Sequence, residues 1–231
     1  MNVRTEELEG PLMEHFVRAR ALAFLKRGRS AGIPDRHLRI NKESFVDMLF
    51  EEYHRGKLEE TASFIYDSPM KLLEIPYIVI DGGDPYIRRR AGFALLFRLI
   101  TCDRFGLYRE AVDLAHKFRT PMALESEGRN DLIEQLKSLD VLFIAELQPR
   151  LFPVNFDTGT FFDEILVSRE NNIKPTILSF VDPVGDSSKF TVDCGDCLHR
   201  MSRCLYADAD KVTNPSRDLL RIRVKKEDGE R

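Results

Sequence analysis

The sequence lacks both a long apolar run and an excess of charge of either sign. No window reaches the roughly 18 to 20 continuous apolar residues that a membrane-spanning helix needs. The N-terminal stretch "MNVRTEELEGPLMEHF" has no apolar core of the kind found in signal peptides. We therefore expect a cytoplasmic protein with no membrane partner. With 35 basic and 38 acidic residues, the net charge is −3, so any nucleic-acid contact must come from a local basic patch.

Common catalytic motifs are also missing, and cysteine is scarce. The five histidines are scattered without an H-E-x-x-H pattern, and no serine lies in a G-x-S-x-G turn. The one metal-like constellation consists of Cys194, Cys197, His199 and Cys204. Free thiols are favoured, because His199 follows Cys197 too closely for easy convergence on one tetrahedral centre. Structural zinc and a redox Cys-x-x-Cys are the alternatives.

Apolar residues at helical spacing dominate the first seventy positions. The stretch "PLMEHFVRARALAFLKRG" predicts one helix, which Gly28 and the "SAGIPDR" that follows are expected to end. Its apolar stripe is expected to face either a core or a partner and is formed by Leu12, Phe16, Ala19 and Leu22. Two shorter helices are predicted from about Glu43 and around residues 58–65. Together these segments form the predicted helical N-terminal extension, residues 1–70.

From Pro76 onward, short apolar runs alternate with helical segments. The runs are "YIVI" (77–80), "VLFIAEL" (141–147) and "PTILSF" (175–180). They are too uniformly apolar for surface strands and are typical of a parallel sheet covered on both faces. Two alternating runs at 189–193 and 219–224 are predicted as edge strands. Strand, helix, strand repeated predicts an α/β core over residues 71–231.

The order of these pieces resembles the DnaC/DnaI helicase loaders and the related IstB proteins, which are AAA+ ATPases. The resemblance covers the chain from about Gly32 to Val224. It is carried by "GIP" before the core, by "YREAVDLAHKF" at the family's second strand and helix, and by "EILVSRENNIKPTILSF". It implies a P-loop NTPase-like parallel sheet flanked by helices. It also implies work by contact with a protein partner, such as a hexameric replicative helicase or an AAA+ homologue, and leaves oligomers and single-stranded DNA open.

The P-loop of that family, G-x-x-x-x-G-K-[ST], departs from its usual residues here. Small residues in this loop let amides reach phosphate, while the lysine and the hydroxyl serve phosphate and magnesium. Gly82 takes the first glycine position, but Ile87 stands at the last glycine. Arg88 then replaces the lysine and Arg89 the hydroxyl residue, and Pro85 removes an amide donor.

A second nucleotide-binding motif also differs from the family's usual residues. In the family, two acids follow the strand aligned with "VLFI"; the first holds magnesium and the second positions water. Here Ala145 and Glu146 stand at these places, and the polar residue expected after the third run falls on Phe180 or Val181. We therefore expect a non-catalytic accessory protein of DNA replication or transposition that has no ATP or magnesium cofactor. The alternatives are an ATPase using Arg88 and Glu146, and a structural subunit without a DNA role.

Arginines supply the candidate contact residues. Arg88, Arg89 and Arg90 are predicted at a helix N-terminus, where they would contact an anion, nucleic acid or an acidic protein. Cations are locally unfavourable at this end of a helix and usually need a partner. The alternative is therefore an exposed first turn that pairs with Asp81 and Asp84.

Three later arginines also have two interpretations each. Arg200 and Arg203 in "LHRMSRCL" lie where the family carries arginines that reach a neighbouring subunit's nucleotide. The resemblance thus implies a role for them in a partner's site. The alternative is that they are solvated or ion-paired helix residues, and Arg169 carries the same two interpretations.

Overall fold

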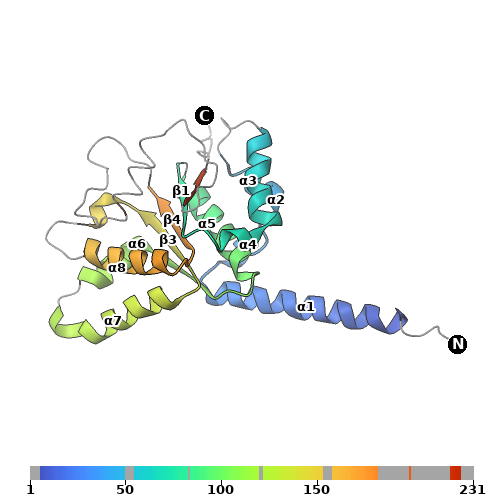
Figure 1. The fold of residues 1–231 in the computed structure, drawn as a ribbon, viewed down its shortest axis with the longest axis horizontal. Helices are drawn as coiled ribbons and strands as arrows, with labels where there is room; N and C mark the ends of the chain where they lie inside the picture. The colour runs from blue at the N-terminus through green and yellow to red at the C-terminus, as the bar shows by residue number, and fades with distance from the viewer. Residues whose placement is uncertain are drawn as a thin grey trace.

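The structure is a computed structural model that describes residues 6–49, 55–82, 84–119, 122–152, 158–181, 198 and 219–224. In three helical stretches only the backbone is described, namely 6–16, 55–57 and 122–127. Figure 1 shows one sheet with helices on both faces, and a long helix, α1 (Glu6–Ser30), that extends away from it. Among the described helices, none is long and apolar enough to cross a membrane.

Five parallel strands form the sheet in the order β2-β3-β4-β1-β5. They are β1 (Tyr77–Asp81), β2 (Gly106–Glu110), β3 (Val141–Leu147), β4 (Thr176–Phe180) and β5 (Leu219–Arg223). Every residue of β1 and β4 is buried, as expected for central strands covered on both faces. The predicted α/β class is confirmed. The run at 189–193 lies outside the described residues.

Helices pack against both faces of the sheet and create two layers of core. One layer involves η1 (Asp35–His37), α2 (Lys42–Val46), α3 (Arg55–Asp67), α4 (Pro69–Leu72) and α5 (Pro85–Ile100). The other involves α6 (Ala111–Arg119), α7 (Met122–Ser138), η2 (Pro149–Leu151) and α8 (Thr158–Asn171). Successive strand side chains point to opposite faces, so Ile78 joins the first layer and Val79 the second. Phe45 and Leu95 share the first layer, which therefore includes residues from both sides of position 70.

The first helix ends at Ser30, within the segment predicted to end it. Gly28 lies in the last turn and is buried, and a Cβ there would lie 2.4 Å from Leu38 Cδ2, so this glycine permits close packing. Leu22 is 66% exposed, which excludes it from the core of this chain. The interface role predicted for Leu22 stays a prediction. The side chains of Leu12 and Phe16 lie outside the described part of the chain.

Gly92 of α5 packs directly against Phe143 of β3. A Cβ at Gly92 would lie 2.1 Å from Phe143 Cζ. The ring cannot move aside easily, because its centroid lies 5.7 Å from that of Phe93 and 5.3 Å from that of Tyr108. We expect Gly92→Ala to lower the free energy of unfolding by about 1 to 3 kcal/mol, measured by chemical denaturation.

Gly128→Ala in α7 is the matched control. Its added Cβ meets nothing within 4 Å, and alanine favours a helix over glycine by up to about 1 kcal/mol. This substitution should therefore leave stability unchanged or raise it. A similar loss of stability in both variants would contradict the packing described for Gly92.

Candidate functional site

A glycine turn connects β1 to α5. Gly82 has a φ of +75°, a left-handed conformation that favours glycine. A Cβ there would also lie 3.1 Å from both Arg223 Cγ and the Val224 carbonyl oxygen. Asp84 then caps α5, because its Oδ1 accepts a hydrogen bond from the Tyr86 amide at 2.6 Å. The turn thus starts α5 at the edge where β1 ends.

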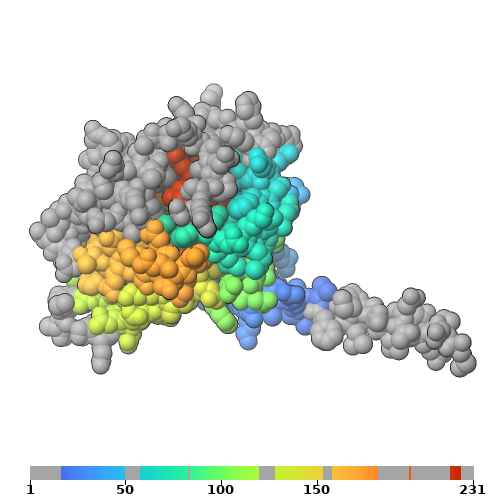
Figure 2. All heavy atoms as spheres, viewed as in Figure 1, coloured from blue at the N-terminus to red at the C-terminus, as the bar shows by residue number. Residues whose placement is uncertain are grey.

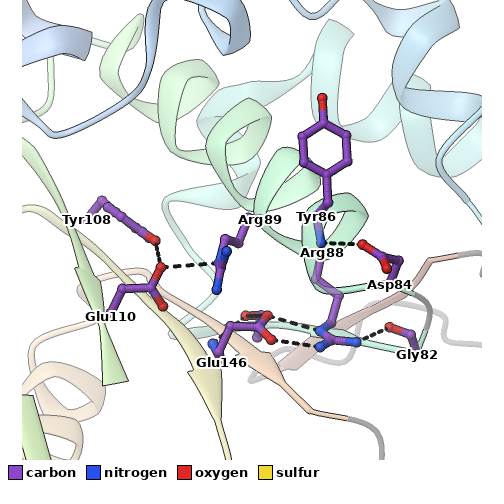
Figure 3. A network of polar contacts seen from close by, with 9 residues as sticks. Gly82, Asp84, Tyr86, Arg88, Arg89, Tyr108, Glu110 and Glu146 are labelled. Atoms are coloured by element: carbon purple, nitrogen blue, oxygen red, sulfur yellow. Dashed lines mark hydrogen bonds and ion pairs between the residues drawn. The ribbon is translucent and has the colours of Figure 1, made fainter. Parts of the chain in front are cut away.

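Arg88 points from the first turn of α5 into the protein, as Figure 3 shows. It is 1% exposed. Its Nη1 donates to the Gly82 carbonyl oxygen at 2.8 Å. Its Nε and Nη2 donate to the two carboxylate oxygens of Glu146 at 3.1 and 2.7 Å. This Arg88–Glu146 pair is bidentate and charge-assisted, the strong form of such a contact.

Glu146 reaches Arg88 through an irregularity in β3. The pairing of β3 with β4 shifts register between Ile144 and Leu147. Glu146 itself has a φ of +61°, which is uncommon for a residue other than glycine. Its amide donates to Ser179 Oγ at 2.8 Å, and that hydroxyl donates to Glu146 Oε1 at 3.2 Å. Two hydrogen bonds from β4 therefore hold Glu146 in place.

Ser179 is a residue of this candidate site that the sequence pattern did not predict. The polar residue expected after the third run was assigned to Phe180 or Val181, whereas Ser179 is the side chain that meets Glu146. Phe180 is buried in the second layer of the core, and its correspondence, or that of Val181, to the family's polar position stays a prediction. Spacing along a sequence assumes regular strands, and the register shift in β3 breaks that assumption. Ala145 is fully buried in the first layer.

Asp81 pairs with two arginines of β5 and not with the arginines at positions 88–90. Arg221 Nη2 donates to Asp81 Oδ2 at 2.5 Å, and Arg223 Nη2 donates to the same oxygen at 3.4 Å. The Asp81 and Arg221 side chains are only 10% and 7% exposed, so this contact ties β1 to β5 in the interior. Asp84 serves as the cap of α5. The interpretation that Arg88 to Arg90 pair with Asp81 and Asp84 is therefore wrong.

The other two arginines of the run have separate surroundings. Arg89 Nε lies 3.2 Å from Glu110 Oε1 in a partly exposed ion pair. That carboxylate also accepts a hydrogen bond from the Tyr108 hydroxyl, and burial together with this bond raises the pKa of Tyr108. Arg90 is half-buried and makes no ion pair within the described chain. Its charge adds to burial, the larger cause, in lowering the pKa of His37.

Arg169 of α8 lies in the interior. Its guanidinium donates to the carbonyl oxygens of Leu136, Leu139 and Pro175 at 2.8 Å each, and to Thr176 Oγ1 at 2.8 Å. These bonds satisfy the end of α7 and fix the connection from α8 to β4. Burial lowers the pKa of Arg169 to about 10. All of these donors are used within the chain, so they are not available to a partner.

The remaining predicted site residues lie outside the described part of the chain. They are Arg200, Arg203, Cys194, Cys197, His199 and Cys204. Their roles stay predictions. Among the described residues, no group of three or more histidines, cysteines or acids is placed to hold a metal ion.

No family model matches the sequence, and no curated protein matches it. Among solved structures, DnaI matches with a TM-score of 0.50 at 12% identity, over 81% of this chain and 95% of that chain. The DnaC helicase loader matches with a TM-score of 0.49 at 14% identity, over 77% and 98%. The replication initiator DnaA, bound to AMPPCP and single-stranded DNA, matches at 0.47 and 17% identity, over 71% of this chain and 45% of that chain. At these identities the likeness concerns the fold alone, a parallel α/β sheet flanked by helices.

The burial of the Arg88–Glu146 pair predicts a large effect of breaking it. Arg88→Met leaves the Glu146 carboxylate, 12% exposed, without its cation. We expect a loss of about 3 to 5 kcal/mol in the free energy of unfolding, measured with denaturant. Glu146→Leu added to Arg88→Met should recover most of that loss, because no buried charge is then left alone.

Arg89→Met is the matched control on the next residue. The Arg89 and Glu110 side chains are 41% and 24% exposed. Ion pairs exposed to this extent contribute about 1 kcal/mol or less to the free energy of unfolding. If Arg88→Met costs no more than Arg89→Met, the Arg88–Glu146 pair is not the structural element described above.

Proposed function

We propose that this chain is a non-catalytic AAA+-like accessory protein that acts by binding a partner protein. The Arg88–Glu146 pair carries this proposal. By the sequence resemblance, Arg88 stands at the phosphate-binding lysine and Glu146 at the acid that positions water. In the structure each of these charges is bound to the other, and Arg88 is also bound to Gly82. Neither charge is therefore presented to a nucleotide phosphate.

Neighbouring positions support the same proposal. A phosphate loop needs amide donors, a flexible glycine and a hydroxyl for magnesium. Pro85 offers no amide donor, Ile87 is a β-branched and buried residue at the last glycine position, and the buried methyl of Ala145 offers no ligand. ATP with magnesium is accordingly not proposed as a cofactor, and the nucleotide motifs are proposed to be degenerate.

The partner is proposed from the sequence resemblance to helicase loaders. A hexameric helicase or an AAA+ homologue engaged in replication or transposition is the proposed class of partner. Contact with single-stranded DNA is proposed as a secondary property, and Arg90 is a suitable cation because it makes no ion pair in the described chain.

Calorimetric titration of the full chain with ATP and magnesium is expected to give no binding heat, since the Arg88 guanidinium is already satisfied. ATP should also leave the melting temperature unchanged. A bound nucleotide at 100 times its Kd would raise the unfolding free energy by about 2.7 kcal/mol, which such a measurement detects readily. Micromolar binding, with hydrolysis abolished by Glu146→Gln, would overturn the proposal and favour the active ATPase.

Capture of the tagged chain from its native host tests the class of partner. We expect a replication or transposition protein among those recovered. A stable complex without any such protein is incompatible with a loader role and would favour a structural subunit. Capture with Arg90→Gln and with Arg150→Gln in parallel asks whether Arg90 takes part, and Arg150, an exposed arginine on η2, serves as the control.

A further inference from the structure

A cleft of about 240 Å³ lies at the amino ends of the strands, on the edge of the sheet opposite the Arg88–Glu146 pair. This amino-edge cleft opens where α4 and α8 end and just before β2, β3 and β4 begin. Figure 2 shows α8, in orange, beside the teal atoms of the α3–α4 region on the viewed face. Pockets that enclose a drug-sized ligand measure roughly 300 to 1,000 Å³, so this cleft suits a side chain better than a nucleotide. The polar residues of its lining are Arg104, Asp140, Asn172 and Lys174.

Arg104 is a cation of this cleft that has no partner in the described chain. It is exposed, and its side chain makes no hydrogen bond or ion pair with the described residues. The preceding acid, Asp103, is already paired with Arg20 and Arg27 at 3.3 and 2.9 Å. The Arg104 guanidinium therefore keeps all of its donors, in the planar fork that matches a carboxylate.

The other charged groups of the lining are held by contacts within the chain. Lys174 Nζ donates to the carbonyl oxygens of Lys137 and Ser138 at 3.0 and 2.9 Å, so one of its three protons remains. Asp140 accepts a hydrogen bond from the Phe105 amide at 2.9 Å. Two cations thus face one partly used carboxylate. The cleft has a local excess of positive charge, although the whole chain has a net charge of −3.

Ile173 lines the cleft in an unfavourable backbone conformation. Its φ is +49°, in the left-handed region where a β-branched residue is an outlier. The Ile173 amide donates to the Glu170 carbonyl at 3.0 Å, and the Lys174 amide donates to the Arg169 carbonyl at 2.9 Å. This is the Schellman ending of a helix, in which glycine usually takes the left-handed position. Ile173 is 59% exposed, so burial offsets little of the strain. Strain of this kind gathers at sites that contact ligands.

More apolar side chains are exposed beside the cleft. Phe105 follows Arg104 and is 66% exposed. Met70 is 58% exposed, and its carbonyl accepts a hydrogen bond at 3.1 Å from the amide of Leu73, a residue of the lining. Exposed apolar side chains around a polar centre are typical of protein interaction sites. A ligand that only filled the cleft would leave Phe105 and Met70 uncovered, whereas a peptide that passed over it would cover them.

We propose that the amino-edge cleft binds an acidic side chain from a peptide segment of a partner protein. Its carboxylate lies on the Arg104 guanidinium, and an adjoining apolar side chain packs on Ile173. The inference rests on the proposed function, because it gives a partner-binding protein a surface for that partner. It needs no nucleotide, and the surface lies at the edge of the sheet remote from the degenerate nucleotide motifs.

NMR titration of the isotope-labelled full chain with a defined probe tests this site. The probe is a tripeptide of leucine, glutamate and leucine that is blocked at both termini. We expect saturable shifts of the Arg104 and Ile173 amide signals. The matched tripeptide with glutamine in place of glutamate should bind about tenfold more weakly, because a charge-assisted hydrogen bond is lost. Inorganic phosphate should displace the probe no better than chloride does at the same ionic strength.

Two variants separate binding from folding. Arg104→Gln should weaken probe binding by about tenfold or more and leave the melting temperature unchanged, since Arg104 has no partner among the described residues. Ile173→Gly should weaken binding and raise the melting temperature, because glycine adopts the left-handed conformation without strain. A residue with only a structural role would not give these opposite changes. Arg150→Gln, which alters an exposed arginine on η2 outside the cleft, should bind like the wild type.

Several results would overturn the proposal. They are the absence of saturable shifts, equal binding of the two tripeptides, unweakened binding by Arg104→Gln, and efficient displacement by phosphate, which would assign the cleft to phosphate groups. Its failure is distinguishable from failure of the proposed function. A chain that captures a replication or transposition protein but does not bind the probe would keep the proposed function and lose only this surface.

Discussion

The burial of the Arg88 guanidinium constrains the whole carboxyl edge of the sheet. A cation removed from water is strongly unfavourable unless its charge and its donors are matched. Glu146 supplies the charge and the Gly82 carbonyl a further acceptor. To bring Glu146 there, β3 shifts register and Glu146 takes a φ of +61°, which Ser179 then supports. The shape of the glycine turn and the end of β3 both follow from this one side chain.

Other buried arginines also connect separate helices and strands of the fold. Arg169 joins the end of α7 to the start of β4, and Arg221 joins β5 to β1 through Asp81. Arg88 joins α5 to β3 in the same manner. Planar guanidinium groups suit such positions, because several donors in a fixed geometry satisfy acceptors from different elements at once. In the proposed function, an arginine at the phosphate-binding position is thus part of a pattern of internal cross-links and not a substitute for the lysine.

Periodicity was sufficient to predict the strands, and insufficient to predict the contacts. Runs such as "YIVI" are apolar throughout, and this property predicts a buried parallel strand directly from the residues. Glu146, by contrast, lies 58 positions from Arg88, and their contact depends on a register shift that no local pattern reveals. The role of Gly28 was missed for a related reason, because its close neighbour Leu38 comes from a different element. A sequence shows which residues are buried more readily than which of them meet.

The closed Arg88–Glu146 pair bears on how assembly of such a protein is regulated. A nucleotide changes the state of a protein only by binding its states with different affinity. On the proposed function no nucleotide binds, so assembly responds to other variables. Local protein concentration, as produced by recruitment to a partner, is one such variable.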